Sequence, residues 1–315
     1  MFEQVIEAIK RHGTVIIHRH SSPDGDALGS QIGLCELIRD NFPGKTVYAV
    51  GDGAGRYSFM DGSVMDVIPD SCYENALSFV LDSATEELVS DKRFKNASES
   101  VRIDHHIYCE TFTGIEIVDT SYESCCGMIA EFARESRLSV SVKAATALFT
   151  GMVTDSGRFR YSCTNARTFE LAAYLTSAGI DSNAIYLDLY ASELSSVLLR
   201  AEFTRKITVY KNSCVAYIYN TKEDLQRLGV TDTFFASRGM VNVMSDIRGI
   251  DIWVNFTEDG DKVLCELRSS RYNINPVAVK YGGGGHQRAS GADVRDHDEA
   301  MRMLEDLRLI SEAAR

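Results

Sequence analysis

The sequence His18-Arg19-His20-Ser21-Ser22-Pro23-Asp24-Gly25-Asp26-Ala27-Leu28-Gly29-Ser30 decides the fold of this chain. It follows an apolar run, residues 14–17, that predicts a buried strand. It precedes an amphipathic run, residues 27–42, that predicts a helix. Two histidines and two carboxylates therefore stand at a strand-to-helix turn, and the packing of a hydrophobic core does not explain such polar side chains there. Because open α/β sheets bind ligands at the carboxyl ends of their strands, we interpret the stretch as half of a metal site.

Apolar segments that alternate with helical patterns run through the first part of the chain. The further predicted strands cover residues 46–50, 78–81, 100–103 and 115–118. This alternation implies crossover connections and a mostly parallel sheet. Polar residues follow several of these strands directly, at Asp82, at Asp104-His105-His106 and at Asp119. Because the carboxyl ends of parallel strands share one edge, we expect these side chains to gather there with the opening stretch.

The periodicity changes near residue 206. Helical periodicity covers residues 124–135, 142–153, 165–177 and 182–205. Beyond it, turn signals at Lys211-Asn212 and Asp259-Gly260 predict hairpins, before a final helix. The fold class is therefore α/β, and its expected parts are a larger domain over residues 1–190, a helical connector over 191–205 and a smaller α/β domain over 206–315. We expect the larger domain to hold the mostly parallel sheet flanked by helices, and the active site to lie in the cleft between the domains.

The composition is that of a soluble globular protein, with 44% hydrophobic and 25% charged residues. A net charge of −12 argues against a broad electrostatic grip on long nucleic acid, although bound cations would change the field near short nucleotides. The eight cysteines are scattered without a CxxC pair, which favours buried thiols in a reducing cytoplasm. No apolar run approaches the roughly 18 residues of a membrane span, so no membrane partner is expected. The oligomeric state stays open, with a homodimer as one alternative.

Four separated clusters supply hard metal ligands. They are His20/Asp24/Asp26, Asp82, Asp104/His105/His106 and Asp155. Oxygen and imidazole ligands suit Mn²⁺ or Mg²⁺. Two ions about 3.5–4 Å apart would use most of these groups, with one aspartate bridging both, and that geometry serves hydrolytic phosphoryl transfer.

Each cluster also has a structural interpretation. Asp24 and Asp26 suit the N-cap and the first turn of the helix that follows them. Asp82 and Asp155 suit caps or turns, and paired histidines suit a solvated loop. His18 is expected to carry no function. The repetition of strands that end in candidate ligands favours the metal site over these separate interpretations.

The order of the clusters resembles the motif set of the DHH phosphoesterase superfamily, which is named for the triplet found here at Asp104-His105-His106. The stretch Pro23 to Ser30 is similar to the first motif of its oligoribonuclease (nanoRNase) members, and Gly151 to Tyr161 resembles their fourth. Gly282 to His286, with Arg268-Ser269 upstream, resembles the DHH-associated substrate-binding domain. The resemblance covers essentially the whole chain and is closest to the bifunctional nanoRNases and 3′-phosphoadenosine 5′-phosphate (PAP) phosphatases.

The resemblance implies a role for each candidate residue. One of two Mn²⁺ ions would be held by His20, Asp24 and Asp82. The other would be held by Asp26, Asp82, His105 and Asp155, so that Asp82 would bridge the pair. The catalytic triplet would be Asp104, His105 and His106, with Asp104 orienting the site and His106 facing the substrate phosphate or the nucleophile. Mg²⁺ is the alternative metal.

The remaining candidates concern the turn and the substrate. Gly25 would allow the tight turn between Asp24 and Asp26. The expected substrate contacts are Arg158, Arg268, Ser269, Gly283, Gly284, Gly285 and His286. A glycine run can present backbone N–H groups to a phosphate, and arginine is shaped for bidentate phosphate contact. The alternatives are a flexible turn for the glycines and a surface charge for Arg158.

The expected activity is metal-dependent hydrolysis of short oligonucleotides, including linear dinucleotides, to nucleoside monophosphates, and of PAP to AMP. The polarity of cleavage, 3′-5′ or 5′-3′, stays open. One alternative is a cyclic or linear dinucleotide phosphodiesterase in second-messenger turnover. Another is a non-catalytic nucleotide-binding sensor, against which the intact ligand set argues. The acidic charge disfavours an exonuclease of the RecJ type on long strands, and the Gly-Gly-Gly-Gly-His element disfavours a family II pyrophosphatase.

Overall fold

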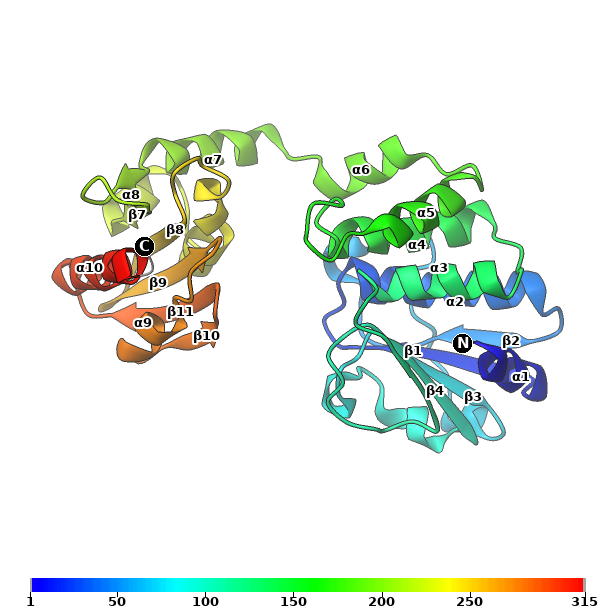
Figure 1. The fold of residues 1–315 in the computed structure, drawn as a ribbon. Coiled ribbons are helices and arrows are strands. Elements are labelled where there is room, and N and C mark those ends of the chain that lie inside the picture. The colour runs from blue at the N-terminus through cyan, green and yellow to red at the C-terminus, as the bar shows by residue number, and fades with distance from the viewer. Residues whose placement is uncertain (1, 314–315) are drawn as a thin grey trace. The chain divides into compact units, whose positions relative to one another are not determined.

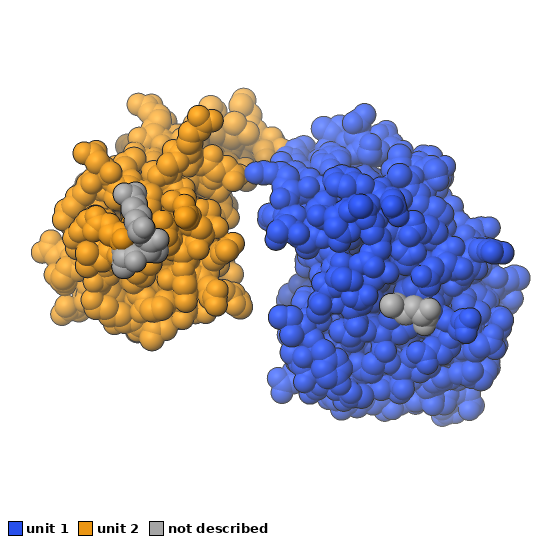
Figure 2. Space-filling model, viewed as in Figure 1, with its two compact units in different colours: residues 1–191 blue, residues 192–315 orange. Residues whose placement is uncertain are grey.

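The computed structural model describes residues 2–313, and the chain divides into two compact units, residues 1–191 and 192–315 (Figure 2). Each unit has its own sheet and its own hydrophobic core. None of the helices within residues 2–313 has the length and apolar content that crossing a membrane requires.

The N-terminal unit is built on a five-stranded sheet with the order β2-β1-β3-β4-β5. Its strands are β1 (Thr14–Arg19), β2 (Thr46–Ala49), β3 (Leu77–Leu81), β4 (Glu99–Asp104) and β5 (Ile115–Val118). All of the pairings are parallel, so the carboxyl ends of the strands lie along one edge. Both faces are covered, which is why the strands read as nearly continuous apolar runs. The predicted parallel sheet is confirmed.

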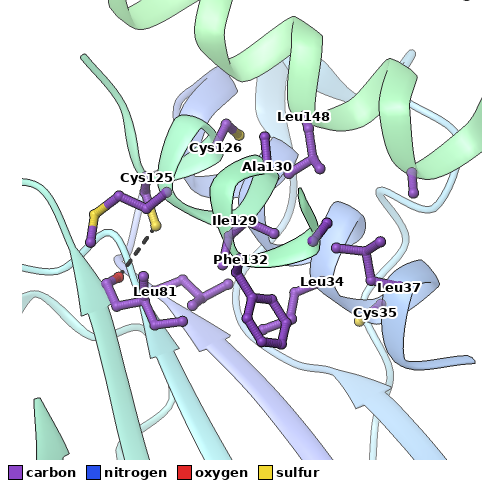
Figure 3. Packing of buried hydrophobic residues seen from close by; sticks show 14 of the residues in the cluster. Leu34, Cys35, Leu37, Leu81, Cys125, Cys126, Ile129, Ala130, Phe132 and Leu148 are labelled. Carbon is purple, nitrogen blue, oxygen red and sulfur yellow. Dashed lines mark hydrogen bonds between the residues drawn. The ribbon is translucent and has the colours of Figure 1, made fainter. Parts of the chain in front are cut away.

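Helices α2 to α6 stack over one face of this sheet (Figure 1). The helices of the unit are α1 (Glu3–Arg11), α2 (Gly25–Asn41), α3 (Cys125–Glu135), α4 (Val142–Asp155), α5 (Ala166–Thr176) and α6 (Ser182–Tyr190). Helix α2 packs against both α3 and α4. Figure 3 shows Leu34, Phe132 and Leu148 of these three helices in the shared core. The Cys125 thiol at the start of α3 donates to the Ile103 carbonyl of β4, which joins the helix layer to the sheet (Figure 3).

Short 3₁₀ helices cover the opposite face. Ile16 of β1 packs in a cluster with Tyr73 of η2 (Asp70–Tyr73), and Val80 of β3 packs with Phe94 of η4 (Lys92–Asn96). His18 is fully buried here, with its ring centroid 5.8 Å from that of Tyr73 and 6.0 Å from that of Phe94. Burial, despite the nearby Asp91, lowers the pKa of His18 to about 4, so this histidine is a neutral core residue.

The C-terminal unit is built on a six-stranded mixed sheet with the order β10-β11-β9-β8-β7-β6. Its strands are β6 (Thr208–Val209), β7 (Val215–Asn220), β8 (Ile252–Asp259), β9 (Lys262–Ser269), β10 (Gly284–His286) and β11 (Ala289–Val294). Its helices are α7 (Leu194–Arg205), α8 (Lys222–Arg227), α9 (Asn275–Lys280) and α10 (His297–Ala313). One face packs on α9 and α10, and the other packs on α7, η5 (Phe235–Gly239) and η6 (Val241–Met244).

The glycine run does not form the open turn that its composition suggested. Gly284–His286 form β10, the edge strand, which pairs antiparallel with β11. Small residues allow the close approach, since a Cβ atom added to Gly283 would lie 2.0 Å from the carbonyl oxygen of Gly291. Because glycine is depleted in strands, propensity alone gives no sign of this one.

Candidate metal centre

Imidazole and carboxylate side chains converge at the carboxyl edge of the N-terminal sheet. They come from the loop after β1, the first turn of α2, the ends of β3 and β4, and the last residue of α4. The side chains that approach one another are His20, Asp24, Asp26, Asp82, His105, His106 and Asp155. The edge therefore brings together residues that are far apart in sequence.

Two of the histidines flank Asp82. His20 Nε2 lies 3.5 Å from Asp82 Oδ2 and 3.9 Å from Asp24 Oδ1. His105 Nε2 lies 3.5 Å from Asp82 Oδ1 and 3.4 Å from Asp155 Oδ2. The two carboxylate oxygens of Asp82 are thus directed to different histidines.

The ligand atoms fall into overlapping groups within which all atoms lie less than 4.8 Å apart. The groups are His20/Asp24/Asp82, Asp26/His105/Asp155 and Asp82/His105/His106. Asp82 Oδ1 is buried and has no hydrogen-bond partner, which is costly unless a cation or another donor is present. Hard oxygen and imidazole donors in this arrangement fit a divalent metal.

The backbone at Asp82 is held in an unusual conformation. Its φ of +51° lies in the left-handed region, which aspartate tolerates better than most residues. Its N–H donates to the Ile103 carbonyl at 3.1 Å, across to β4. The side chain is only 2% exposed, so β3 ends with a fixed carboxylate in the middle of the cluster.

Asp26 is held by the N-terminus of α3. Its Oδ2 accepts from Cys125 N–H at 2.7 Å, and its Oδ1 accepts from Cys126 N–H at 2.8 Å. Free N–H groups at a helix N-terminus stabilise a nearby negative charge. Nevertheless, burial and the charges of Asp82 and Asp155 raise the pKa of Asp26 well above its usual range.

Two glycines let α2 approach α4. A Cβ atom on Gly25 would lie 2.5 Å from Thr154 Oγ1, and one on Gly151 would lie 2.2 Å from Cys126 Sγ and 3.0 Å from Asp26 Cα. The expected role of Gly25 in a tight turn is therefore wrong, because this residue starts the helix and its missing side chain makes room for α4. The close approach brings Asp155 to Asp26.

Asp104 orients a neighbouring histidine and does not join the ligand groups. Its Oδ1 lies 2.8 Å from His106 Nδ1, and its Oδ2 accepts from Arg102 at 2.6 Å. Arg102 is fully buried in β4 and also reaches Glu116 at 3.1 Å. The hydrogen bond to Asp104, against burial, raises the pKa of His106.

The cluster carries charges that a cation would balance. Burial lowers the pKa of His20, but the Asp24 and Asp82 carboxylates raise it by more, so that this pKa is about 10. Burial likewise lowers the pKa of His105, and the carboxylates of Asp82, Asp26 and Asp155 raise it to about 10. Burial raises the pKa of Asp155 to about 6. The carboxylates at this edge thus favour positive charge on the neighbouring imidazoles, which is the charge that a divalent cation would supply when bound.

Comparison with known proteins identifies the same segments. Residues 14–152 match the DHH family N-terminal domain, and residues 233–312 match the DHHA1 domain. Over 310 residues the chain is 34% identical to the Bifunctional oligoribonuclease and PAP phosphatase NrnA of Bacillus subtilis, across 98% of this chain and 97% of that protein. The chain belongs to the DHH family.

Further relatives of this DHH chain match over similar lengths. The NrnA protein of Mycoplasma genitalium is 35% identical over 312 residues, which is 96% of this chain and 95% of that protein. A crystal structure of an exopolyphosphatase-related protein from Bacteroides fragilis gives a TM-score of 0.78 at 26% identity, over 97% of this chain and 94% of that one.

Asp24 combines the two roles that its sequence position allowed. Its Oδ1 accepts from the N–H groups of Asp26 and Ala27, both at 3.0 Å, and so caps α2. The same side chain faces His20 within the first ligand group of the DHH centre. Capping and metal ligation are therefore compatible here, because the cap fixes the carboxylate beside the histidine.

Sequence reasoning missed Arg19 and Asp52, which hold the loop after β1. Arg19 is fully buried and donates to Asp52 Oδ1 at 2.8 Å and to the His20 carbonyl at 3.1 Å. Asp52 Oδ2 accepts from the Ser22 N–H at 2.7 Å. The available signal was a basic residue inside an apolar strand, which needs a partner when it is buried. Arg102 in β4 carries the same signal.

We predict that the Asp52→Asn variant loses less free energy of unfolding than the parent when the pH falls from 5 to 3. Burial opposes the hydrogen bonds from Ser22 and Arg19, which lower the pKa of Asp52 to about 2, below its value in the unfolded chain. Its stabilising contribution is therefore complete above about pH 4 and is lost between about pH 4 and pH 2. Urea unfolding at pH 5, 4 and 3 should show the parent converging on the variant. Asp40→Asn, at an exposed aspartate, is the control. If the difference in unfolding free energy between the parent and Asp52→Asn stayed constant from pH 5 to pH 3, the role of Asp52 in holding this loop would be contradicted.

The expected substrate residues lie in different surroundings. Arg158 stacks on Tyr190, with Cζ 3.6 Å from the ring centroid, and is not among the clustered ligands. Arg268 pairs with Glu266 at 3.0 Å. Ser269 Oγ donates to the Asp251 carbonyl and accepts from the Tyr272 N–H, so it organises the turn after β9. His286 is exposed at the end of β10, and Gly283 to Gly285 lead into it.

Proposed function

We propose that this chain is a Mn²⁺-dependent phosphoesterase that hydrolyses short oligonucleotides, including linear dinucleotides, to nucleoside monophosphates, and PAP to AMP. The observation that carries the proposal is the pair of ligand groups on either side of the buried Asp82. Relatives with 34% and 35% identity bear the name Bifunctional oligoribonuclease and PAP phosphatase NrnA, which supports the same chemistry.

The residues present fit two divalent ions. One would be held by His20, Asp24 and Asp82, and the other by Asp26, Asp82, His105 and Asp155. When bound, the ions supply Lewis-acid chemistry that activates water and neutralises charge developing on the phosphate. Mn²⁺ is preferred and Mg²⁺ is the alternative, because carboxylates and imidazoles form the whole set.

The chain's own residues supply orientation and proton control. A carboxylate can only accept, so the short contact to Asp104 places a proton on His106 Nδ1. The half-exposed ring then offers Nε2 to a substrate phosphate or to the attacking water. Arg102 holds Asp104, and the N-terminus of α3 holds Asp26, so both positions are fixed before substrate arrives.

We assign the substrate phosphate contacts to Arg268 and His286. Both are cross-strand partners of Ala289 and therefore face the same side of the C-terminal sheet. A few contacts to a terminal nucleotide also suit a chain with a net charge of −12 better than a long basic track would. All eight cysteines are free thiols, which supports a reducing compartment such as the cytoplasm.

A panel of substrates with Mn²⁺, read by product analysis, tests the proposal. Linear dinucleotides should yield nucleoside monophosphates and PAP should yield AMP, while long RNA and cyclic dinucleotides should react much more slowly. Dominant cleavage of a cyclic dinucleotide would favour the second-messenger alternative. Nucleotide binding without any hydrolysis would favour the sensor and would contradict the proposal.

A further inference from the structure

The C-terminal unit contains a cavity of about 380 Å³ beside the glycine run. This volume lies within the range of small-molecule sites. Its polar lining residues include Glu266, Asp293 and Ser237, and Phe234 lies at its wall. None of these residues belongs to the metal centre, which lies in the other unit.

The floor of this cavity is glycine backbone. Gly291 pairs across the sheet with Glu266 on one side and with Gly284 on the other. A Cβ atom on Gly291 would lie 3.7 Å from Glu266 Oε1, so the carboxylate lies beside the bare backbone. A flat ligand can therefore lie on the glycines with its edge against Glu266.

Ser237 is an independent sign that a ligand is missing. The residue is 1% exposed, and its Oγ has no hydrogen-bond partner. A buried hydroxyl without a partner is costly, and Ser237 is one of the residues around the cavity. A ligand that carries hydrogen-bonding groups would satisfy it.

Phe234 adds a surface for stacking. Its side chain is 58% exposed at the cavity wall, although large apolar residues are usually covered. Aromatic faces stack nucleobases of any type. A planar ring that donates hydrogen bonds from one edge fits the combination of glycine floor, aromatic wall and carboxylate.

We propose that this cavity is a nucleobase subsite that prefers guanine and that Glu266 determines the preference. Guanine presents two adjacent donors, N1–H and N2–H₂, to one carboxylate. Adenine presents a single amino donor on that edge, beside the N1 acceptor, which the carboxylate repels. This proposal rests on the proposed function, because the base would belong to the nucleotide whose phosphate the chain binds.

The position along the sheet supports the assignment. Glu266 and Arg268 are two residues apart on β9, about 7 Å along a strand, and face the same side. Gly284 and His286 have the same relation on β10. A base at Glu266 and a phosphate at Arg268 and His286 would thus be separated along the strand direction, with the ribose between them. Arg268 pairs with Glu266 Oε2, but each carboxylate oxygen can accept more than one hydrogen bond, so Oε2 and Oε1, which lies beside Gly291, can both accept from the base.

Equilibrium dialysis of the full chain with GMP and with AMP, in chelator so that no metal ion contributes to binding, tests the subsite. We expect GMP to bind about tenfold more tightly than AMP, the discrimination of one good bidentate contact. Glu266→Gln should weaken GMP binding about tenfold and leave AMP binding nearly unchanged, since the amide still accepts from Arg268 but cannot accept twice from guanine. Ser237→Ala should weaken GMP binding in the same direction, and Glu258→Gln on β8 should have no effect.

Equal binding of GMP and AMP, or loss of both in Glu266→Gln, would overturn the subsite. Hydrolysis of guanosine and adenosine dinucleotides with Mn²⁺, measured on the same preparations, keeps the two proposals apart. Turnover without base preference, combined with equal binding, would leave the proposed function standing and remove the subsite. Selective GMP binding without turnover of any dinucleotide would support the subsite and contradict the proposed function.

Discussion

Replacing Asp82 with asparagine is expected to lower kcat for dinucleotide hydrolysis about a thousandfold, the effect of losing several kcal/mol of charge stabilisation. Asp82 belongs to two of the ligand groups, is 2% exposed, and has an Oδ1 without a hydrogen-bond partner. An amide of the same shape removes the negative charge that both ions would share. Bound Mn²⁺, measured on the purified variant, should fall together with the activity.

The fold of this variant should survive. Removing the Asp82 charge relieves its repulsion of the buried Asp26 but also removes the carboxylate that favours the charged forms of His20 and His105. Because these effects oppose one another, we expect the metal-free thermal midpoint to stay close to that of the parent, while the stabilisation by Mn²⁺ is lost. Asp119→Asn is the matched control, because that aspartate also follows a strand, but its side chain accepts from the nearby Ser121 and is not in the ligand groups. Normal turnover by Asp82→Asn with full Mn²⁺ content would contradict the bridging role.

Arg102→Met is expected to destabilise the chain by about 3–5 kcal/mol, the usual effect of breaking a buried ion pair. Arg102 and Asp104 are both fully buried, and the arginine also donates to the carbonyls of Glu110 and Ala84. The change leaves the Asp104 carboxylate without its arginine partner, and because Asp104 positions His106, kcat should fall as well. Urea unfolding and dinucleotide turnover measure the two effects.

A surface arginine provides the comparison. Arg295 pairs with Glu299 at 3.1 Å, but its side chain is 78% exposed, so Arg295→Met should change stability little. Arg102→Lys keeps the charge but not the fork of donors, and it should recover part of the stability. Equal losses in Arg102→Met and Arg295→Met would show that the buried pair does not support the site.

The sequence predicted the parts of the site that follow from strand periodicity. Asp82 and His105 were recognisable because each directly follows an apolar run, and parallel strands bring such positions to one edge. Asp155 was a candidate ligand as well, but it ends a helix and not a strand, so its place beside Asp26 depends on the approach of α4 to α2 that Gly25 and Gly151 allow. Pair distances of this kind come from packing, which periodicity does not encode.

Other features lay beyond periodicity altogether. The glycine run became an edge strand because β11 offers small residues opposite it, a cross-strand property that a single segment does not reveal. From the sequence, Glu266 is an ordinary polar residue of an alternating strand. Its position beside the cavity follows from the cross-strand pairing with Gly291, which the sequence does not show. Arg19 and Arg102 were visible as basic residues within apolar strands. Arg19 meets Asp52 through a tertiary contact, whereas Arg102 pairs with Asp104 two residues along β4, and only the fold shows that both of these are buried.

A titration of Mn²⁺ into chelated protein, followed by hydrolysis of a 5′-phosphorylated dinucleotide, tests the di-metal phosphoesterase most directly. The metal-free chain should be inactive, and turnover should return as about two ions bind per chain, the number that a pair of ligand groups sharing one aspartate accommodates. Full turnover in metal-free buffer would contradict it.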